Sequence, residues 1–138
     1  MEHLLHYVWK HKLFPLQILQ TTEGLRVEVI DSGLQNSDAG PDFFNAKLKI
    51  DGTLWVGNIE IHTHSSDWYR HGHNNDKAYD SVILHVVEEA DTEVTRSDGE
   101  TIPQLRLTCP ENIQTHYHEL CRADQYPACY SIIGFLSK

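Results

Sequence analysis

The sequence contains no apolar run that approaches the roughly 18 to 20 residues needed to cross a membrane. Its first residues, Met-Glu-His-Leu-Leu-His, also lack the basic region and the cleavage site of a secretory signal peptide. These two absences predict a protein with no membrane span and favour a cytoplasmic location.

Cysteine is scarce, and the three that occur lie in the last thirty residues of the chain, Cys109, Cys121 and Cys129. An odd number at uneven spacing is a poor disulfide framework, and no Cys-x-x-Cys pair is present to bind zinc. We therefore expect free thiols with a structural role.

Positive charge is also in short supply. The 11 lysines and arginines face 20 acidic residues, which gives a formal net charge of −9. This balance disfavours a broad electrostatic footprint for nucleic acid. It is compatible with a small acidic site in which a metal ion supplies positive charge to a phosphate group. Histidine, by contrast, is abundant: the chain has 10, and four crowd into the segment 62–73, namely His62, His64, His71 and His73.

The overall composition is that of an ordinary folded domain, with 40% apolar and 22% charged residues. Apolar residues between Leu4 and Leu13 have helical spacing and predict a helix that stops before Pro15. Alternation of apolar and polar residues predicts strands over 26–29, 46–50 and 54–64, the last two joined at Asp51-Gly52. A helix that starts at Asp67 and is interrupted near Gly72 and Asn74-Asn75 is expected next, followed by a central strand over 82–87.

The predicted core runs helix, strand, strand, strand, helix, strand, which indicates a mixed α/β fold with a central mixed β-sheet. Asp98-Gly99 predicts a second, small hairpin between 93–95 and 102–107. We expect one domain over 1–108 and a helical extension over 109–138. Because the extension ends in an apolar stretch, it favours a chain that is the front part of a longer protein.

The residues best suited to chemistry lie on the first predicted hairpin. Glu60 and His62 are two apart in a strand and share one face. A two-residue loop would pair Asp42 with Ile61 on the other face, whereas a three-residue loop over 51–53 pairs it with His62. The longer loop also unites the apolar positions and is preferred. Asp42 and Glu60 are then predicted to bind Mg²⁺ or Mn²⁺, with His62 orienting or deprotonating the attacking water.

A competing prediction uses the histidines as a cluster. His62-x-His64 on a strand and His71-x-His73 in the following segment have the number and type of ligands that hold Zn²⁺. A mixed site that shares His62 stays open as well. His85, which lies within an apolar strand, is expected to be a hydrogen-bonded core residue.

Two resemblances add to this interpretation. Pro41-Asp42 and Glu60-x-His62, on the second and third strands of the predicted core, resemble the PD-(D/E)XK nuclease superfamily over roughly residues 1 to 90. The resemblance implies a restriction-endonuclease-like fold with Asp42 and Glu60 as metal ligands and His62 in place of the superfamily's lysine. More closely, the residues at 9–10, 39–43, 57–62, 66–68 and 83–87 resemble a bacterial family known only as a domain of unknown function, whose members are longer.

A third prediction is non-catalytic, because a neutral histidine lacks the fixed positive charge of that lysine. The domain would then be a degenerate nuclease fold that serves as an interaction module for a missing C-terminal region, for another protein or for further copies of itself. Among these alternatives, the prediction we carry forward is a metal-dependent phosphodiesterase or nuclease-like domain acting on nucleic acid.

Overall fold

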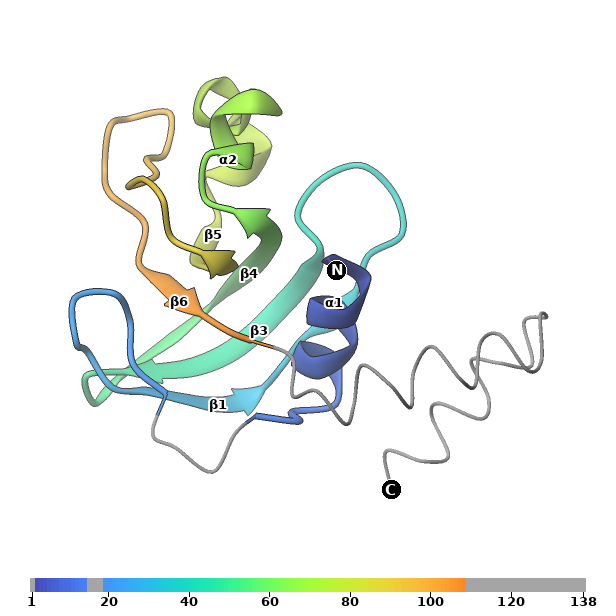
Figure 1. Cartoon of the computed structure of the whole chain (residues 1–138), viewed down its shortest axis with the longest axis vertical. Coiled ribbons are helices and arrows are strands. Elements are labelled where there is room, and N and C mark those ends of the chain that lie inside the picture. The colour runs from blue at the N-terminus through green and yellow to red at the C-terminus, as the bar shows by residue number, and fades with distance from the viewer. Residues whose placement is uncertain (1, 15–18, 109–138) are drawn as a thin grey trace, which may run out of the picture. The chain divides into compact units, whose positions relative to one another are not determined.

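The computed structural model describes residues 2–14 and 19–108, where the chain forms a mixed α/β structure with a six-stranded mixed sheet and few helices (Figure 1). The predicted helical extension and the three cysteines lie outside the described residues. In the described part, no helix is long and apolar enough to cross a membrane. The strands are β1 (Val27–Asp31), β2 (Leu34–Gln35), β3 (Phe43–Ile50), β4 (Thr53–His64), β5 (Val82–Glu89) and β6 (Gln104–Arg106).

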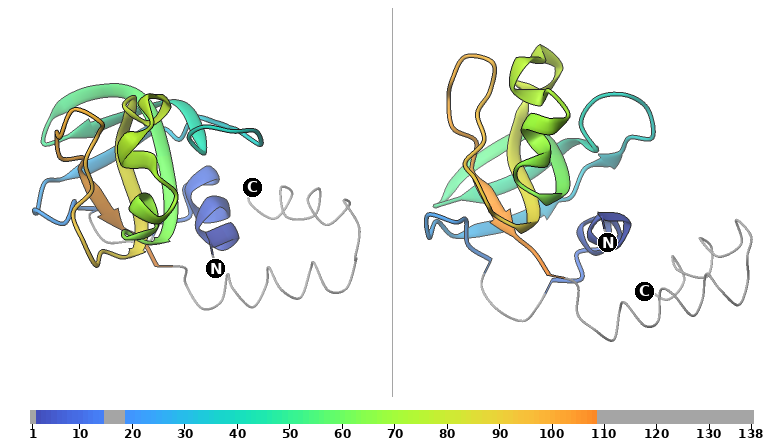
Figure 2. Two further views of the ribbon diagram at one scale, coloured as in Figure 1. Left: turned by 90° about the horizontal axis from the view of Figure 1, so that it is seen from above. Right: turned by 45° about the horizontal axis from the view of Figure 1, so that its top comes forward.

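The sheet is strongly twisted, and its order is β1-β3-β4-β5-β6, with β2 paired to β3 (Figure 2). β1, β3 and β4 are antiparallel neighbours, whereas β4, β5 and β6 run parallel to one another. β4 is therefore the strand at which the pairing changes from antiparallel to parallel. Its second half is buried over residues 59–62, including the polar residues Glu60 and His62.

The predicted N-terminal helix is α1 (Glu2–Lys10), which contacts β4. Its buried face consists of the residues expected from their spacing, Leu4, Leu5, Val8 and Trp9. The indole Nε1 of Trp9 donates a hydrogen bond to the carbonyl of Ser32 at 2.9 Å and ties the helix to the end of β1. The helix ends at Lys10, earlier than predicted, and the backbone turns left-handed at Lys12, with φ 54°.

The turn of the β3–β4 hairpin differs from the expected one. Ile50 pairs with Thr53, so the loop contains only Asp51 and Gly52, and the preferred three-residue loop is wrong. The two loop residues have φ of 51° and 82°. Positive φ at both central positions is the geometry whose twist matches that of the flanking strands, which explains why the shorter loop is favoured.

A β-bulge compensates for the shorter turn. The register of β3 against β4 shifts by one residue between Phe43 and Ala46. Asn45, inside the bulge, adopts a left-handed φ of 58°. Without the shift, Asp42 would share a face with the apolar side of β4. With it, Asp42 comes beside Glu60.

Three short helical segments connect β4 to β5: α2 (Asp67–Arg70), η1 (His73–Asn75) and η2 (Lys77–Tyr79). The helix expected in this region is thus interrupted, with Gly72 at φ 72° between the first two segments. The prediction of a central strand is confirmed, since residues 82–87 of β5 are all buried.

The second predicted hairpin is reduced to one bridge between Thr95 and Thr101. The residues that follow form β6, which leaves the hairpin and pairs in parallel with β5. Leu105 and Leu107 are buried there. A longer hairpin would leave these side chains off the main sheet and would lose the free energy of burying them.

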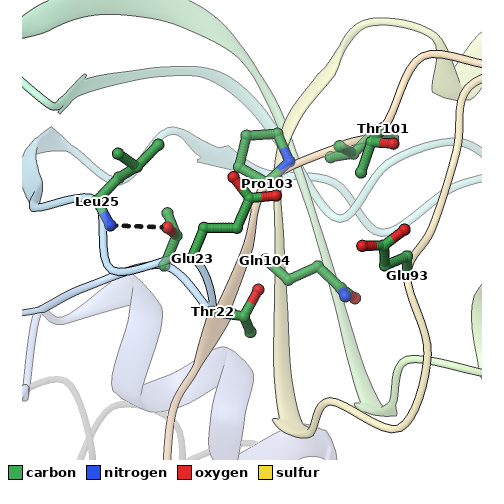
Figure 3. A pocket seen from close by; sticks show the side chains of 9 residues that line it. Thr22, Glu23, Leu25, Glu93, Thr101, Pro103 and Gln104 are labelled. Atoms are coloured by element: carbon green, nitrogen blue, oxygen red, sulfur yellow. Dashed lines mark hydrogen bonds between the residues drawn. The ribbon is translucent and has the colours of Figure 1, made fainter.

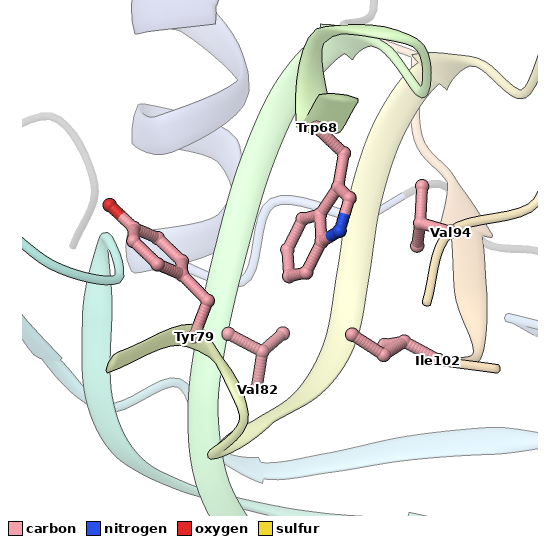
Figure 4. Close-up of a cluster of buried hydrophobic side chains, with 5 residues drawn as sticks. All are labelled: Trp68, Tyr79, Val82, Val94 and Ile102. Carbon is pink, nitrogen blue, oxygen red and sulfur yellow. The ribbon is translucent and has the colours of Figure 1, made fainter. Parts of the chain in front are cut away.

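A hydrophobic cluster joins the crossover, which is the segment of short helices between β4 and β5, to the residues that follow β5. It consists of Trp68, Tyr79, Val82, Val94 and Ile102 (Figure 4). The indole Nε1 of Trp68 donates to the carbonyl of Thr95 at 2.9 Å. The cluster therefore holds the short helical segments against β5.

Candidate metal centre

The candidate site is built on the buried polar face of β4. Glu60 and His62 are alternate residues of this strand and point to one face. Only 4% of Glu60 and 2% of His62 are exposed. Polar groups at this depth need partners, because an unpaired buried carboxylate or imidazole raises the free energy of the folded state.

Asp42 precedes β3 and is hydrogen-bonded to both Glu60 and Ile61 of β4. The backbone N–H of Asp42 donates to Oε1 of Glu60 at 3.1 Å, and Oδ2 of Asp42 accepts from the N–H of Ile61 at 2.8 Å. Nε2 of His6, from α1, lies 3.4 Å from Oδ2 of Asp42. The two carboxylates predicted to act together are thus direct neighbours.

The second carboxylate oxygen of Glu60 faces histidines. Oε2 of Glu60 lies 2.9 Å from Nε2 of His73 and 3.3 Å from Nε2 of His62. His71 Nδ1 lies 3.2 Å from the same nitrogen of His62. One possible ligand atom from each of the three histidines lies within 4.8 Å of the others. The carboxylate site and the histidine cluster, which the sequence presented as alternatives, therefore form one cluster.

His64 is directed elsewhere. Its Nε2 lies 3.1 Å from Oε2 of Glu89 on β5, and 45% of its side chain is exposed. Its backbone N–H donates to the carboxylate of Asp67. The structure thus brings together three of the four crowded histidines and places the fourth at the end of the strand.

Packing fixes His73 in the cluster. Its ring stacks on Tyr79, with ring centroids 3.7 Å apart and planes 16° apart. The ring of Trp68 lies edge-on to it at 5.2 Å. The hydrophobic cluster of Figure 4 therefore supports the histidine that contacts Glu60 most closely.

The pKa values of the two carboxyl groups are shifted in opposite directions. Burial and the neighbouring charge of Asp42 raise the pKa of Glu60 from 4.5 to about 10. Burial would also raise the pKa of Asp42, but the hydrogen bond and charge of His6 and the N–H of Ile61 outweigh it and lower that pKa. Without a cation, the pair at neutral pH consists of an ionised Asp42 and a protonated Glu60.

The buried histidines are neutral. Burial, together with the neighbouring histidines, lowers the pKa of His62 to about 3 and that of His73 to about 4. Burial likewise lowers the pKa of His85 to about 4. A neutral imidazole keeps one nitrogen lone pair, which is the form that binds metals.

Two histidines that the sequence did not place in the site lie against it. One is His6, whose Nε2 lies 3.4 Å from Oδ2 of Asp42, and the available signal was its place between the apolar residues Leu5 and Val8. His85 is confirmed as a fully buried, hydrogen-bonded residue, but its partner is the site itself, since its Nε2 lies 2.7 Å from Nδ1 of His62. The sequence signal was that His85 is a polar residue in a strand predicted to be buried on both faces, because such a residue needs a buried polar partner.

A separate pocket of about 260 Å³ lies beside β6, between the segments 21–25 and 93–103 (Figure 3). Its wall includes the carboxylates of Glu23 and Glu93 and the side chain of Gln104. Gln104 also contacts the histidines, because its Oε1 lies 2.9 Å from Nδ1 of His85. One side chain thus connects the wall of this pocket to the candidate site.

The donor set fits a divalent cation of the first transition series. Imidazole nitrogens suit Zn²⁺, and a carboxylate oxygen, which also suits Mn²⁺, completes such a set. The buried oxygen of Glu60 facing neutral imidazoles is also the place where a cation would replace a proton. Mg²⁺ would find fewer of the oxygen ligands that it prefers.

The fold and the cluster define a mixed α/β domain with a buried carboxylate and histidine site on its central strand. A family model described as "Protein of unknown function (DUF2851)" matches residues 2–138, and the chain belongs to this family. Comparisons with curated proteins and with solved structures give no match. The resemblance to a domain of unknown function is therefore confirmed, and the comparisons leave the nuclease resemblance without support.

Proposed function

We propose that this domain is a divalent-metal-dependent phosphodiesterase that acts on nucleic acid. The observation that carries the proposal is the position of the Glu60 carboxylate, which touches Asp42 on one side and His62 and His73 on the other. A metal-dependent hydrolase needs such a set of oxygen and nitrogen donors on a rigid element.

Glu60, His62 and His73 would hold the ion, with His71 completing the set. Once bound, the ion would lower the pKa of a water molecule and neutralise charge on a phosphate oxygen. Asp42 keeps its charge beside this set, and its side chain is 22% exposed. It is therefore the group able to accept a hydrogen bond from water that approaches the site from outside.

We assign His62 the role of a ligand in preference to that of a water-orienting base. Its pKa of about 3 makes it a weak base at neutral pH. Its Nε2 is surrounded by Glu60 and His71, so a lone pair there is directed into the cluster. This assignment also accounts for the absence of a lysine, because the ion would supply the positive charge.

The order of the elements favours a phosphodiester substrate. A helix, antiparallel strands, a helical crossover and a parallel strand follow one another as the nuclease resemblance implies. That resemblance would place Asp42 and Glu60 together at the metal, and here Glu60 would bind the ion while Asp42 lies beside it. The net charge of −9 argues that contact with nucleic acid is confined to the ion and its surroundings.

A second candidate function is a structural metal site in a non-catalytic interaction module. The depth of Glu60 and His62 favours it, since structural sites are closed while catalytic sites keep an open position. An ion held by His73 would then fasten the crossover to β4.

Cleavage assays distinguish the two candidates. The chain is purified without a histidine tag, loaded with Mn²⁺, Zn²⁺ or Mg²⁺, and incubated with single- and double-stranded DNA and RNA. We expect cleavage with Mn²⁺ or Zn²⁺ that falls to background in Glu60→Gln and persists in His64→Gln. Stoichiometric metal binding with no cleavage of any substrate would overturn the phosphodiesterase proposal and leave the structural site.

A further inference from the structure

A continuous line of hydrogen bonds runs from β6 through the interior to the candidate metal centre. Nε2 of Gln104 donates to the carbonyl of Thr92 at 2.8 Å, and Oε1 of Gln104 lies 2.9 Å from Nδ1 of His85. Nε2 of His85 in turn lies 2.7 Å from Nδ1 of His62. Gln104, His85 and His62 are 5%, 0% and 2% exposed, so water does not compete for these contacts.

The carbonyl of Thr92 fixes the direction of the line. A carbonyl only accepts hydrogen bonds, so it holds the NH₂ group of Gln104 and turns the amide oxygen toward His85. The reversed amide would place two oxygens against each other. Because the amide oxygen also only accepts, Nδ1 of His85 must carry a proton.

The proton position on His85 in turn fixes the proton position on His62. A neutral His85 with its proton on Nδ1 has a lone pair on Nε2, and it accepts a hydrogen bond from Nδ1 of His62. A neutral His62 with its proton on Nδ1 has its lone pair on Nε2. That nitrogen is the one that lies 3.3 Å from Oε2 of Glu60 and 3.2 Å from His71.

We propose that Gln104 and His85 are positioning residues that hold His62 in the tautomer protonated on Nδ1, so that the Nε2 lone pair faces Glu60, His71 and His73. The inference deepens the proposed metal site, because ligand histidines bind through one nitrogen while the other donates to a fixed partner. Its geometry does not depend on an ion being bound.

The alternative tautomer would disable the site. If the proton of His62 lay on Nε2, an N–H group would point into the cluster and no lone pair would be offered there. Gln104 thus acts on a ligand that it does not touch, across the width of β5. Nothing in the segment 62–73 alone distinguishes the two tautomers.

The experiment reads the tautomer directly. Chain labelled with ¹⁵N in histidine is treated with EDTA, and long-range ¹H–¹⁵N spectra at neutral pH assign each ring nitrogen of His62 and His85 as protonated or bearing a lone pair. We expect protonated Nδ1 and a lone pair on Nε2 for both residues. A proton on Nε2 of His62 in the native protein would overturn the inference, and this measurement needs no variant.

Two variants of Gln104 test its part. Gln104→Leu removes the acceptor, so we expect His62 to populate both tautomers and the Zn²⁺ or Mn²⁺ dissociation constant to rise about 10–100-fold. Gln104→Glu, with its buried carboxyl protonated, can donate to the carbonyl of Thr92 and still accept from Nδ1 of His85, and should retain the native tautomer. An unchanged His62 tautomer in folded Gln104→Leu would show that Gln104 does not position it.

The outcome is separable from that of the proposed function. The expected tautomer in a protein that binds no metal would support the positioning line and overturn the metal centre. Metal binding together with an Nε2–H tautomer of His62 in the EDTA-treated protein would support the metal centre and overturn the positioning role of Gln104 and His85.

Discussion

Oε2 of Glu60 lies 2.9 Å from Nε2 of His73, which joins the central strand β4 to the η1 segment of the crossover. Burial and Asp42 raise the pKa of this carboxyl to about 10, and burial lowers the pKa of His73 to about 4. Without an ion, the contact therefore consists of a protonated carboxyl and a neutral imidazole. A cation placed between them would release that proton, which couples metal binding to proton release.

Metal binding is the first prediction. We expect isothermal titration calorimetry on EDTA-treated, dialysed protein to give one Zn²⁺ or Mn²⁺ per chain. Glu60→Gln and His73→Gln should weaken binding by more than the roughly 10–100-fold typical of losing a ligand's hydrogen-bond partner.

His64→Gln is the matched control, since it removes a histidine from the same strand that is directed to Glu89. Its affinity should equal that of the native chain. Equal loss in His64→Gln and His73→Gln would show that the ion is bound elsewhere.

The second prediction concerns stability without metal. The folded-state pKa of Glu60, about 10, exceeds its ordinary value of 4.5, so the folded chain holds a proton that the unfolded chain releases. This contribution to stability is fully present below pH 4.5 and is lost as pH rises toward 10.

Glu60→Gln keeps the shape of the protonated side chain without a titratable group. Urea unfolding in EDTA should show that the free energy of unfolding of the native chain falls relative to that of Glu60→Gln as pH rises from 6 to 9, with a slope of about one proton. Parallel curves for the two proteins would contradict a raised pKa at Glu60.

The third prediction tests the bulge that places Asp42. Asn45 has a φ of 58°, which a β-branched residue adopts only with strain. We expect Asn45→Val to cost about 1–2 kcal/mol of stability and to weaken metal binding, because the register of β3 shifts. Asn45→Gly, which adopts positive φ freely, should preserve both properties. Denaturant unfolding measures the stability of the two variants, and metal titration measures their affinity. Equal stability and equal affinity in both variants would show that the bulge is not set by residue 45.

The fourth prediction concerns the contact between β4 and β5. A Cβ atom on Gly57 would lie 2.5 Å from Cγ2 of Ile83 and 2.9 Å from the carbonyl oxygen of Ser81. Gly57→Ala should therefore destabilise the domain by about 1–3 kcal/mol, as overpacking does. Gly52→Asn is the control, because no atom lies within 4 Å of its Cβ position and Asn tolerates its φ of 82°. Denaturant midpoints of the two variants measure the difference, and a wild-type midpoint for Gly57→Ala would contradict the close approach.

Much of the fold was accessible from local pattern. Leu48 and Ile50 alternate with lysines, and both lie in a strand with their side chains buried. The same reasoning failed at the turn, where Asp51-Gly52 alone forms the loop. The alternation stays intact in either register, so it does not reveal the one-residue bulge at Asn45 that offsets the shorter turn.

Part of the candidate site could also be predicted from local pattern. Glu60 and His62 were grouped correctly because residues two apart in a strand share a face. The separation of His64 from His71 and His73 depends on where β4 ends and on the left-handed turn at Gly72. These are features of loop closure and packing, which a short pattern does not encode.

The sequence by itself determined the strand that carries the polar face, because the period of two is a local property of the backbone. It also determined that this face holds a carboxylate and a histidine. Only the tertiary structure decided which other groups meet them: Asp42 through a bulge, His73 through a crossover, and His85 with Gln104 through parallel pairing of β5 and β6. Contacts between residues distant in the chain depend on register and on burial of neighbouring side chains, and these are set when the whole sheet assembles.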